Sequence, residues 1–156
     1  MQYDIGPRVL PLCRWIRSDS SLEILTHSGW VAHLQTMPDK INIAQKFSQI
    51  HEYWKPYIAG ELNGQLVKLD KLKGEFVWHH HENEDEMFLV VKGRFRIEFR
   101  DKSVSLEEGE FIVVPRGVEH KPVAEEECWI LLFEPASTLN TGNVENEWTL
   151  HELDRV

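Results

Sequence analysis

Turn signals recur at short intervals from Tyr57 onward, and their spacing constrains the fold more than any other feature of the sequence. Asn63-Gly64 separates YIAGEL from QLVKLDKL, which indicates a hairpin because both central positions of a type I′ turn need a positive φ. Further breaks fall at Lys73-Gly74, Lys92-Gly93, Glu107-Glu108-Gly109 and Pro115-Arg116-Gly117. Strands this close together can hardly be joined by helical crossovers, so the sequence predicts an antiparallel all-β barrel or sandwich.

A helical pattern precedes the predicted strands. Ile43, Phe47, Ile50 and Trp54 fall on one stripe of a helix, which predicts a helix from about 41 to 54 that Pro56 stops. With 156 residues, the chain is too short for two domains of ordinary size. We therefore expect one domain with tails, divided as an N-terminal extension (1–36), the helix that packs on or leads into the barrel (37–56), the barrel (57–135), and a C-terminal loop and tail (136–156).

The N-terminal extension, residues 1–36, has apolar residues without a sustained period and is interrupted by Pro, Ser and Gly. It is interpreted either as an arm that packs on the barrel or as an appendage upstream of a functional start at Met37. The change of pattern at Met37 favours the appendage. Deletion of residues 1–36 separates the two, because loss of an appendage should leave the melting temperature nearly unchanged.

Charge and cysteine content exclude several classes of protein. The chain has 17 Lys and Arg against 26 Asp and Glu, a net charge of -9, which argues against non-specific nucleic-acid binding and against an anionic membrane surface. It contains no apolar run of about 18 residues and no signal-peptide pattern. Cys13 and Cys128 follow neither a zinc nor a disulfide spacing. We expect a cytoplasmic protein with reduced thiols.

The stretch WHHHENEDEMF (78–88) gathers polar groups between two apolar runs. Side chains alternate faces along a strand, so His79 and His81 share one face while His80 points the other way. If the chain turns and returns antiparallel, Glu86 lies opposite the two histidines. Two imidazoles and a carboxylate suit Fe, Mn, Ni, Cu or Zn. The alternative is a hydrophilic hairpin end without a metal.

A second segment, GEFIVVPRGVEHKPV (109–123), supplies another histidine, His120. Together the two segments resemble the two motifs of the cupin family, in the order that the family has them. The first motif is matched by Gly74-(x4)-His79-x-His81-(x4)-Glu86-(x6)-Gly93, and the second by Gly109-(x5)-Pro115-x-Gly117-(x2)-His120. The match departs from the family twice, since one residue fewer separates Gly74 from His79 and Ala124 stands where the motif has Asn. Neither departure removes a ligand.

The resemblance implies a small single-domain cupin, whose fold is a double-stranded β-helix, the jelly-roll barrel. It also implies that one divalent transition-metal ion is bound by His79, His81, Glu86 and His120. We expect a pocket beside these ligands. Its lining is expected to come from the inward faces of neighbouring strands, namely Phe88, Val90, Phe111, Val113, Trp129 and Leu131.

Open coordination positions would allow the metal to act on a small-molecule substrate. Our first hypothesis is therefore a metal-dependent enzyme on a small polar metabolite, of oxygenase or isomerase type, although the sequence offers no separate acid or base on the inward faces. The alternatives are a metal- or ligand-binding module without turnover, such as a sensor or scavenger, and a structural metal clip.

An apolar row, Met87, Leu89 and Val91, lies on the opposite face of the same predicted strand and must be covered. The cover is the helix, another strand of the chain, or a second copy of the protein. The last option makes a homodimer, which the family resemblance also suggests.

Overall fold

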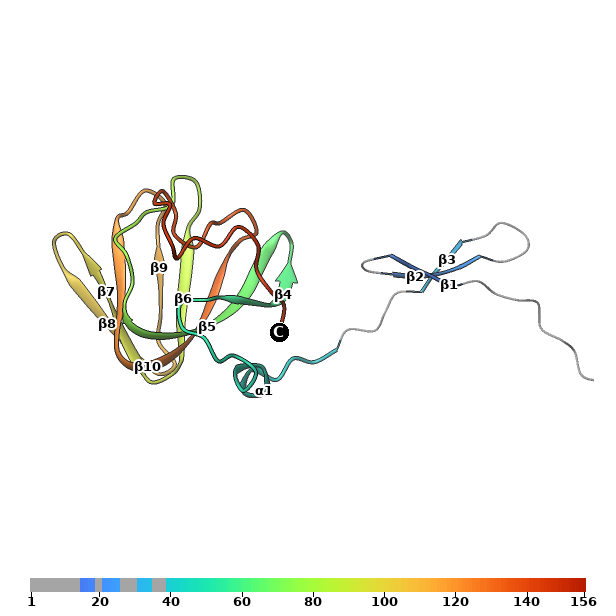
Figure 1. Cartoon of the computed structure of the whole chain (residues 1–156), viewed down its shortest axis with the longest axis horizontal. Coiled ribbons are helices and arrows are strands. Elements are labelled where there is room, and N and C mark those ends of the chain that lie inside the picture. The colour runs from blue at the N-terminus through green and yellow to red at the C-terminus, as the bar shows by residue number, and fades with distance from the viewer. Residues whose placement is uncertain (1–14, 19–20, 26–30, 35–38) are drawn as a thin grey trace, which may run out of the picture. The chain divides into compact units, whose positions relative to one another are not determined.

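The computed structural model describes residues 15–18, 21–25, 31–34 and 39–156, and the chain divides into two compact units, Met1–Lys40 and Ile41–Val156 (Figure 1). In the first unit, β1 (Trp15–Ser18), β2 (Ser21–Leu25) and β3 (Val31–Leu34) form an antiparallel sheet in the order β1-β2-β3. Cys13 lies outside the described residues. No helix among the described residues is long and apolar enough to cross a membrane.

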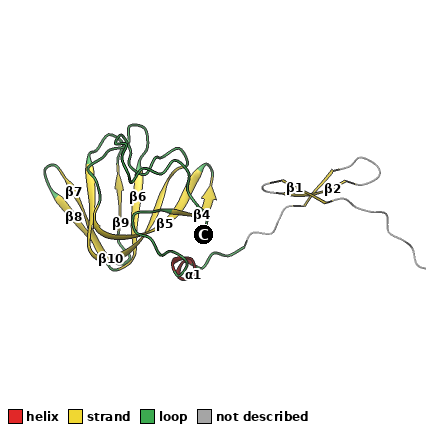
Figure 2. Ribbon diagram, in the orientation of Figure 1, coloured by secondary structure: helices red, strands yellow, loops and turns green. Residues whose placement is uncertain are grey.

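The second unit is a barrel of antiparallel strands with a single short helix among its described residues (Figure 2). Its strands are β4 (Tyr57–Leu62), β5 (Gln65–Glu75), β6 (Glu86–Lys92), β7 (Arg94–Phe99), β8 (Ser103–Glu107), β9 (Phe111–Val114) and β10 (His120–Pro135). The predicted all-β jelly-roll class is confirmed. The predicted hairpin joins β4 to β5, and Asn63 and Gly64 have φ values of 52° and 77°.

The long strand β10 connects the two sides of the barrel. Its first residues, His120–Val123, pair with β7, and the stretch from Cys128 to Pro135 pairs with β5. The same stretch also pairs with β6, which completes the order β4-β5-β10-β6-β9, while β7 pairs with β10 and β8. An irregularity between Ala124 and Cys128 separates the two parts of β10. One strand therefore carries both a predicted ligand, His120, and much of the barrel wall.

The helix α1 is shorter than the sequence predicted, spanning only Ile43–Phe47. The Asn42 side chain accepts a hydrogen bond from Gln45 N over 3.1 Å and caps its start. The chain then leaves the helix, and Trp54 has a φ of 59°. The apolar stripe correctly marked buried residues, but they pack in two places rather than along one helix. Phe47 packs outside the barrel and Trp54 packs inside it.

Two apolar clusters hold the unit together. The larger one fills the barrel and contains Trp54, Leu72, Phe88, Val90, Phe95, Ile97, Leu106, Val114, Ala124, Cys128, Ile130 and Leu132. The smaller one is built on Phe47, Ile50 and Leu69, with Val91, Trp129 and Leu131 packed against it. Val91 of the predicted apolar row is therefore covered by residues of the same chain.

Candidate metal centre

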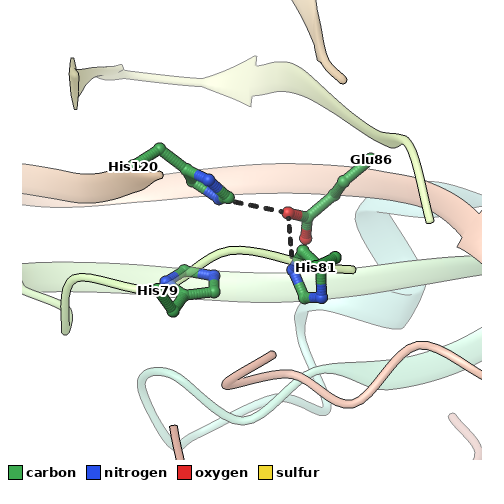
Figure 3. Close-up of side chains that lie close together, drawn as sticks. All are labelled: His79, His81, Glu86 and His120. Atoms are coloured by element: carbon green, nitrogen blue, oxygen red, sulfur yellow. Dashed lines mark ion pairs between the residues drawn. The ribbon is translucent and has the colours of Figure 1, made fainter. Parts of the chain in front are cut away.

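The four predicted ligands lie together inside the barrel (Figure 3). His79 and His81 lie between β5 and β6, Glu86 is the first residue of β6, and His120 is the first residue of β10. One ligand atom from each residue lies within 4.8 Å of the others. The four residues are 2%, 4%, 5% and 0% exposed, in chain order. The fold thus gathers side chains from two separate motifs into one buried cluster.

Backbone contacts fix the two segments against each other. His79 and His120 form an isolated antiparallel bridge, and Gly117 N donates to His81 O over 2.7 Å. Gly117 has a φ of 75°, a conformation that glycine adopts without steric cost. The Pro115–Gly117 turn therefore supports His81 directly.

The ring nitrogens of two histidines are oriented by carbonyl groups. His79 Nδ1 lies 3.0 Å from Val77 O, and His120 Nδ1 lies 2.9 Å from Val118 O. A carbonyl oxygen can only accept a hydrogen bond, so Nδ1 carries the proton in both rings. The lone pair of each Nε2 is then free to bind a metal, which is the usual way that proteins orient a metal-binding histidine.

Three atoms of the cluster have no hydrogen-bond partner among the described residues, namely His81 Nε2, Glu86 Oε2 and His120 Nε2. Glu86 Oε2 lies 3.3 Å from His81 Nε2 and 3.4 Å from His120 Nε2. These are ion-pair distances, but neither contact is a hydrogen bond. Buried polar atoms without partners are costly. A divalent cation would satisfy all three, so the residues fit a metal ion.

The buried environment favours the protonation states that bind metals. Burial lowers the pKa of His79 to about 4, and the neighbouring His120 acts in the same direction, so His79 is neutral at pH 7. Burial by itself would raise the pKa of Glu86, but its interactions with His120 and His81 outweigh burial and hold that pKa below its usual range. Neutral imidazole and ionised carboxylate are the forms that coordinate cations.

Comparison with known proteins identifies the family. The pattern of the cupin domain matches residues 65–132. A solved structure of a cupin-2 domain containing protein from Shewanella frigidimarina is 48% identical in sequence to this chain, with a TM-score of 0.60. The match covers 61% of this chain and 93% of the Shewanella protein. This chain belongs to the cupin superfamily. The cupin is also similar to protein NMB1881 from Neisseria meningitidis, at 36% identity and a TM-score of 0.59, over 63% of this chain and 100% of that one. The uncharacterized protein YdbB from Bacillus subtilis is 31% identical over 81 residues, which cover 51% of this cupin and 72% of YdbB.

A cavity of about 30 Å³ adjoins the cluster and is lined in part by His79 and Glu86. Phe88 lines it as expected, whereas Val90 is buried in the same apolar cluster without lining the cavity.

The expected lining is corrected at four other positions. Phe111 and Val113 are 63% and 50% exposed, and they pair with Leu89 and Met87 on the outer face of β6. Ile112 and Val114 lie on the inward face of β9 instead. The expected facing of this strand was wrong by one residue, and a shift of one residue turns every side chain of a strand to the other face. Trp129 and Leu131 alternate with the buried Ile130 and pack against the smaller apolar cluster, that of Phe47, Ile50 and Leu69.

The C-terminal segment also contacts the centre. From the sequence, residues 139–143 are interpreted as a plain turn in preference to a cap on the barrel mouth. Asn143 holds the backbone of His80 at both ends, since Asn143 N donates to His80 O over 3.0 Å and His80 N donates to Asn143 Oδ1 over 2.9 Å. A Cβ at Gly142 would meet His80 O at 2.2 Å and His81 Nδ1 at 3.3 Å. Only glycine therefore permits this close approach.

Sequence reasoning also missed polar residues inside the barrel. Lys68 and Asp70 on β5 and Glu134 on β10 are all buried, and Asp70 and Glu134 line the cavity. A signal was present in the alternation of Leu66, Lys68, Asp70 and Leu72 on one side of β5. Glu134 likewise continues the inward series of Ile130 and Leu132 on β10.

Proposed function

We propose that this cupin binds one divalent transition-metal ion (Fe, Mn, Zn, Ni or Cu) through His79, His81, Glu86 and His120. We further propose that it is an enzyme of oxygenase or isomerase type acting on a small polar metabolite. The supporting observation is that the unsatisfied ligand atoms converge next to a cavity lined by His79 and Glu86. A metal that a small molecule can reach is what distinguishes a catalytic site from a closed structural one.

When bound, such an ion polarises a substrate oxygen, and iron or copper adds redox chemistry. The chain contributes the setting for that chemistry. His79 and His120 present their Nε2 lone pairs because carbonyl groups hold Nδ1, and Glu86 adds a negative charge. Apolar side chains, including Phe88 and Leu132, line the cavity. They exclude bulk water and strengthen electrostatic interactions with a bound molecule.

A second candidate is a metal-binding module or structural clip without turnover. The observation that favours it is the size of the cavity, since about 30 Å³ is room for only about two water molecules. A clip would be unfolded by chelation, whereas an enzyme should stay folded without its metal. Oxygen consumption with chelating substrates such as catechols, thiols and β-diketones would favour the enzyme.

The first experiment is elemental analysis of untagged protein purified without added metal or chelator, because a histidine tag would bind metal itself. The matched variants are His81→Ala, which removes a ligand, and His80→Ala. His80 is a suitable control because its side chain pairs with the exposed Glu82 over 3.4 Å. Its two hydrogen bonds with Asn143 use only the backbone N and O of His80, which the substitution keeps. We expect one metal per chain in the wild type and His80→Ala, and none in His81→Ala. No metal in any sample, and none taken up on titration, would contradict the proposal.

A further inference from the structure

An ion pair lies inside the barrel outside the set of metal ligands. Lys68 Nζ donates a hydrogen bond to Glu134 Oε1 over 2.7 Å, and the two side chains are 1% and 2% exposed. Lys68 Nζ also lies 3.5 Å from Thr138 O. Pairs of this kind contribute little to stability, because desolvation of both charges offsets their attraction. Stability alone therefore does not account for this pair.

The second oxygen of Glu134 is the informative atom. Glu134 Oε2 is buried and has no hydrogen-bond partner among the described residues. It shares this property with the three unsatisfied atoms of the metal cluster. Glu134 also lines the cavity that His79 and Glu86 line. A buried acceptor facing a cavity is a position at which a bound molecule could donate a hydrogen bond.

Strand register places this acceptor beside the metal cluster. Leu132 pairs with Phe88 and Phe133 pairs with Met87 across β10 and β6. One further step along the same antiparallel register brings Glu134 opposite Glu86, and residues opposite each other share a face of the sheet. A small molecule in the cavity could therefore contact a metal held by Glu86 and the carboxylate of Glu134 at the same time.

Charge in the cavity selects what can bind there. Its ionisable lining consists of His79 and the carboxyl groups of Asp70, Glu86 and Glu134. Lys68 is already committed to Glu134 Oε1, and Asp70 accepts a hydrogen bond from Lys55 N over 3.1 Å. The cavity is thus rich in carboxyl oxygens. Burial raises the pKa of Asp70 and of Glu134, so Glu86 carries most of the negative charge, and that charge disfavours an anionic ligand.

We propose that Glu134, oriented by Lys68, is a ligand-binding residue that accepts a hydrogen bond from an N–H or O–H group. The ligand is a small neutral or cationic molecule, or the end of a longer one, with a donor next to an oxygen that binds the metal. Amides, hydroxyketones and amino alcohols have this chemistry. The hydrogen bond to Glu134 is inferred from the cavity alone. The contact of the ligand oxygen with a metal rests on the function proposed above.

Glu134→Gln tests the proposal at nearly constant volume. The ammonium group of Lys68 only donates hydrogen bonds, so the amide introduced by this substitution must turn its carbonyl oxygen toward Lys68. The NH₂ group of that amide then faces the cavity. The substitution therefore replaces an acceptor by a donor at the proposed position, which should reverse the preference between ligands that donate and ligands that accept.

The probes are acetamide and acetate, which have the same shape but differ in the N–H donor. Binding is followed by the methyl NMR signals of Ile130 and Leu132, which line the cavity, in zinc-loaded protein freed of excess metal and in metal-free protein. The pH is 9, because burial raises the pKa of Glu134 to about 8. The ratio of acetate to acetamide dissociation constants should fall about tenfold or more in Glu134→Gln. Glu126→Gln, an exposed position in β10, should leave the ratio unchanged.

An unchanged ratio in a folded Glu134→Gln protein overturns the proposal. If that variant does not fold, the wild type decides by comparing acetamide with acetone, which has the same shape and no donor. Acetone binding as tightly as acetamide overturns the proposal, as does no binding of acetamide up to about 100 mM, the weak range expected for four heavy atoms. The zinc content of each sample tests the metal site separately, and the metal-free arm tests Glu134 without it.

Discussion

His79 and His120 exchange two backbone hydrogen bonds, in which His79 N donates to His120 O over 3.0 Å and His120 N donates to His79 O over 2.9 Å. Their ring centroids lie 4.3 Å apart. Backbone atoms thus join two ligand positions that are distant in sequence. We therefore expect the protein to stay folded after chelation. Circular dichroism and thermal melting of chelated protein check this, and loss of the cooperative transition would favour the structural clip.

The pH dependence of stability should report His79 in chelated protein. Its folded pKa of about 4 lies below the ordinary value of 6.5, so the unfolded chain binds the proton first as the pH falls. The contribution is complete above pH 6.5 and is lost as the pH falls to about 4, amounting to roughly 3 kcal/mol. Urea unfolding of wild type and His79→Asn across this range measures the difference, because other buried groups are common to both. Parallel curves would contradict the assignment.

At pH 9, above the raised pKa of Glu134, Lys68→Met should destabilise the barrel by roughly 3–5 kcal/mol, because it leaves Glu134 buried without its partner. The double variant Lys68→Met/Glu134→Met should recover most of that loss, since an apolar pair of similar volume has no charge to desolvate. Denaturant midpoints of both variants and the wild type provide the measurement. A double variant less stable than the single one would show that the pair itself stabilises the fold.

The contact of Asn143 with His80 should matter for metal affinity. Asn143→Ala removes the acceptor for His80 N and loosens the support of the neighbouring His81, so zinc affinity should fall about tenfold, at the low end for residues that support ligands. Competition with a chromophoric chelator measures the affinity. Glu145→Ala is the control, because Glu145 is exposed on the same segment and its carboxylate pairs with the exposed His151 at 3.5 Å. Equal affinities for both variants would assign Asn143 a role in the loop alone.

The outer face of β6 and β9 should mediate a homodimer. Phe111 and Val113 are largely exposed and lie beside the half-buried Leu89 and Met87, which forms an apolar patch that proteins usually cover. We expect a dimer mass by light scattering and a monomer for Phe111→Lys. Leu62→Lys, also at an exposed apolar residue but in the β4–β5 hairpin, should leave the mass unchanged. A wild-type monomer would rule out the homodimer.

Local chemistry made much of this cupin predictable. The hairpin at Asn63-Gly64 follows from the φ values that its turn requires, and the shared face of His79 and His81 follows from alternation in an extended chain. The ligand spacing, read with the resemblance, predicted which four residues lie together. The hairpin and the shared face of His79 and His81 use only neighbours in sequence, whereas His120 was joined to the other ligands by the resemblance.

The sequence by itself determined the all-β class, the family and the cluster of His79, His81, Glu86 and His120. Tertiary structure alone decided that Ile112 rather than Phe111 faces the barrel and that Glu134 lines the same cavity as Glu86. The physical reason is register. Which residue of one strand lies opposite which residue of another depends on packing across the whole barrel, and a slip of one position exchanges its inside for its outside.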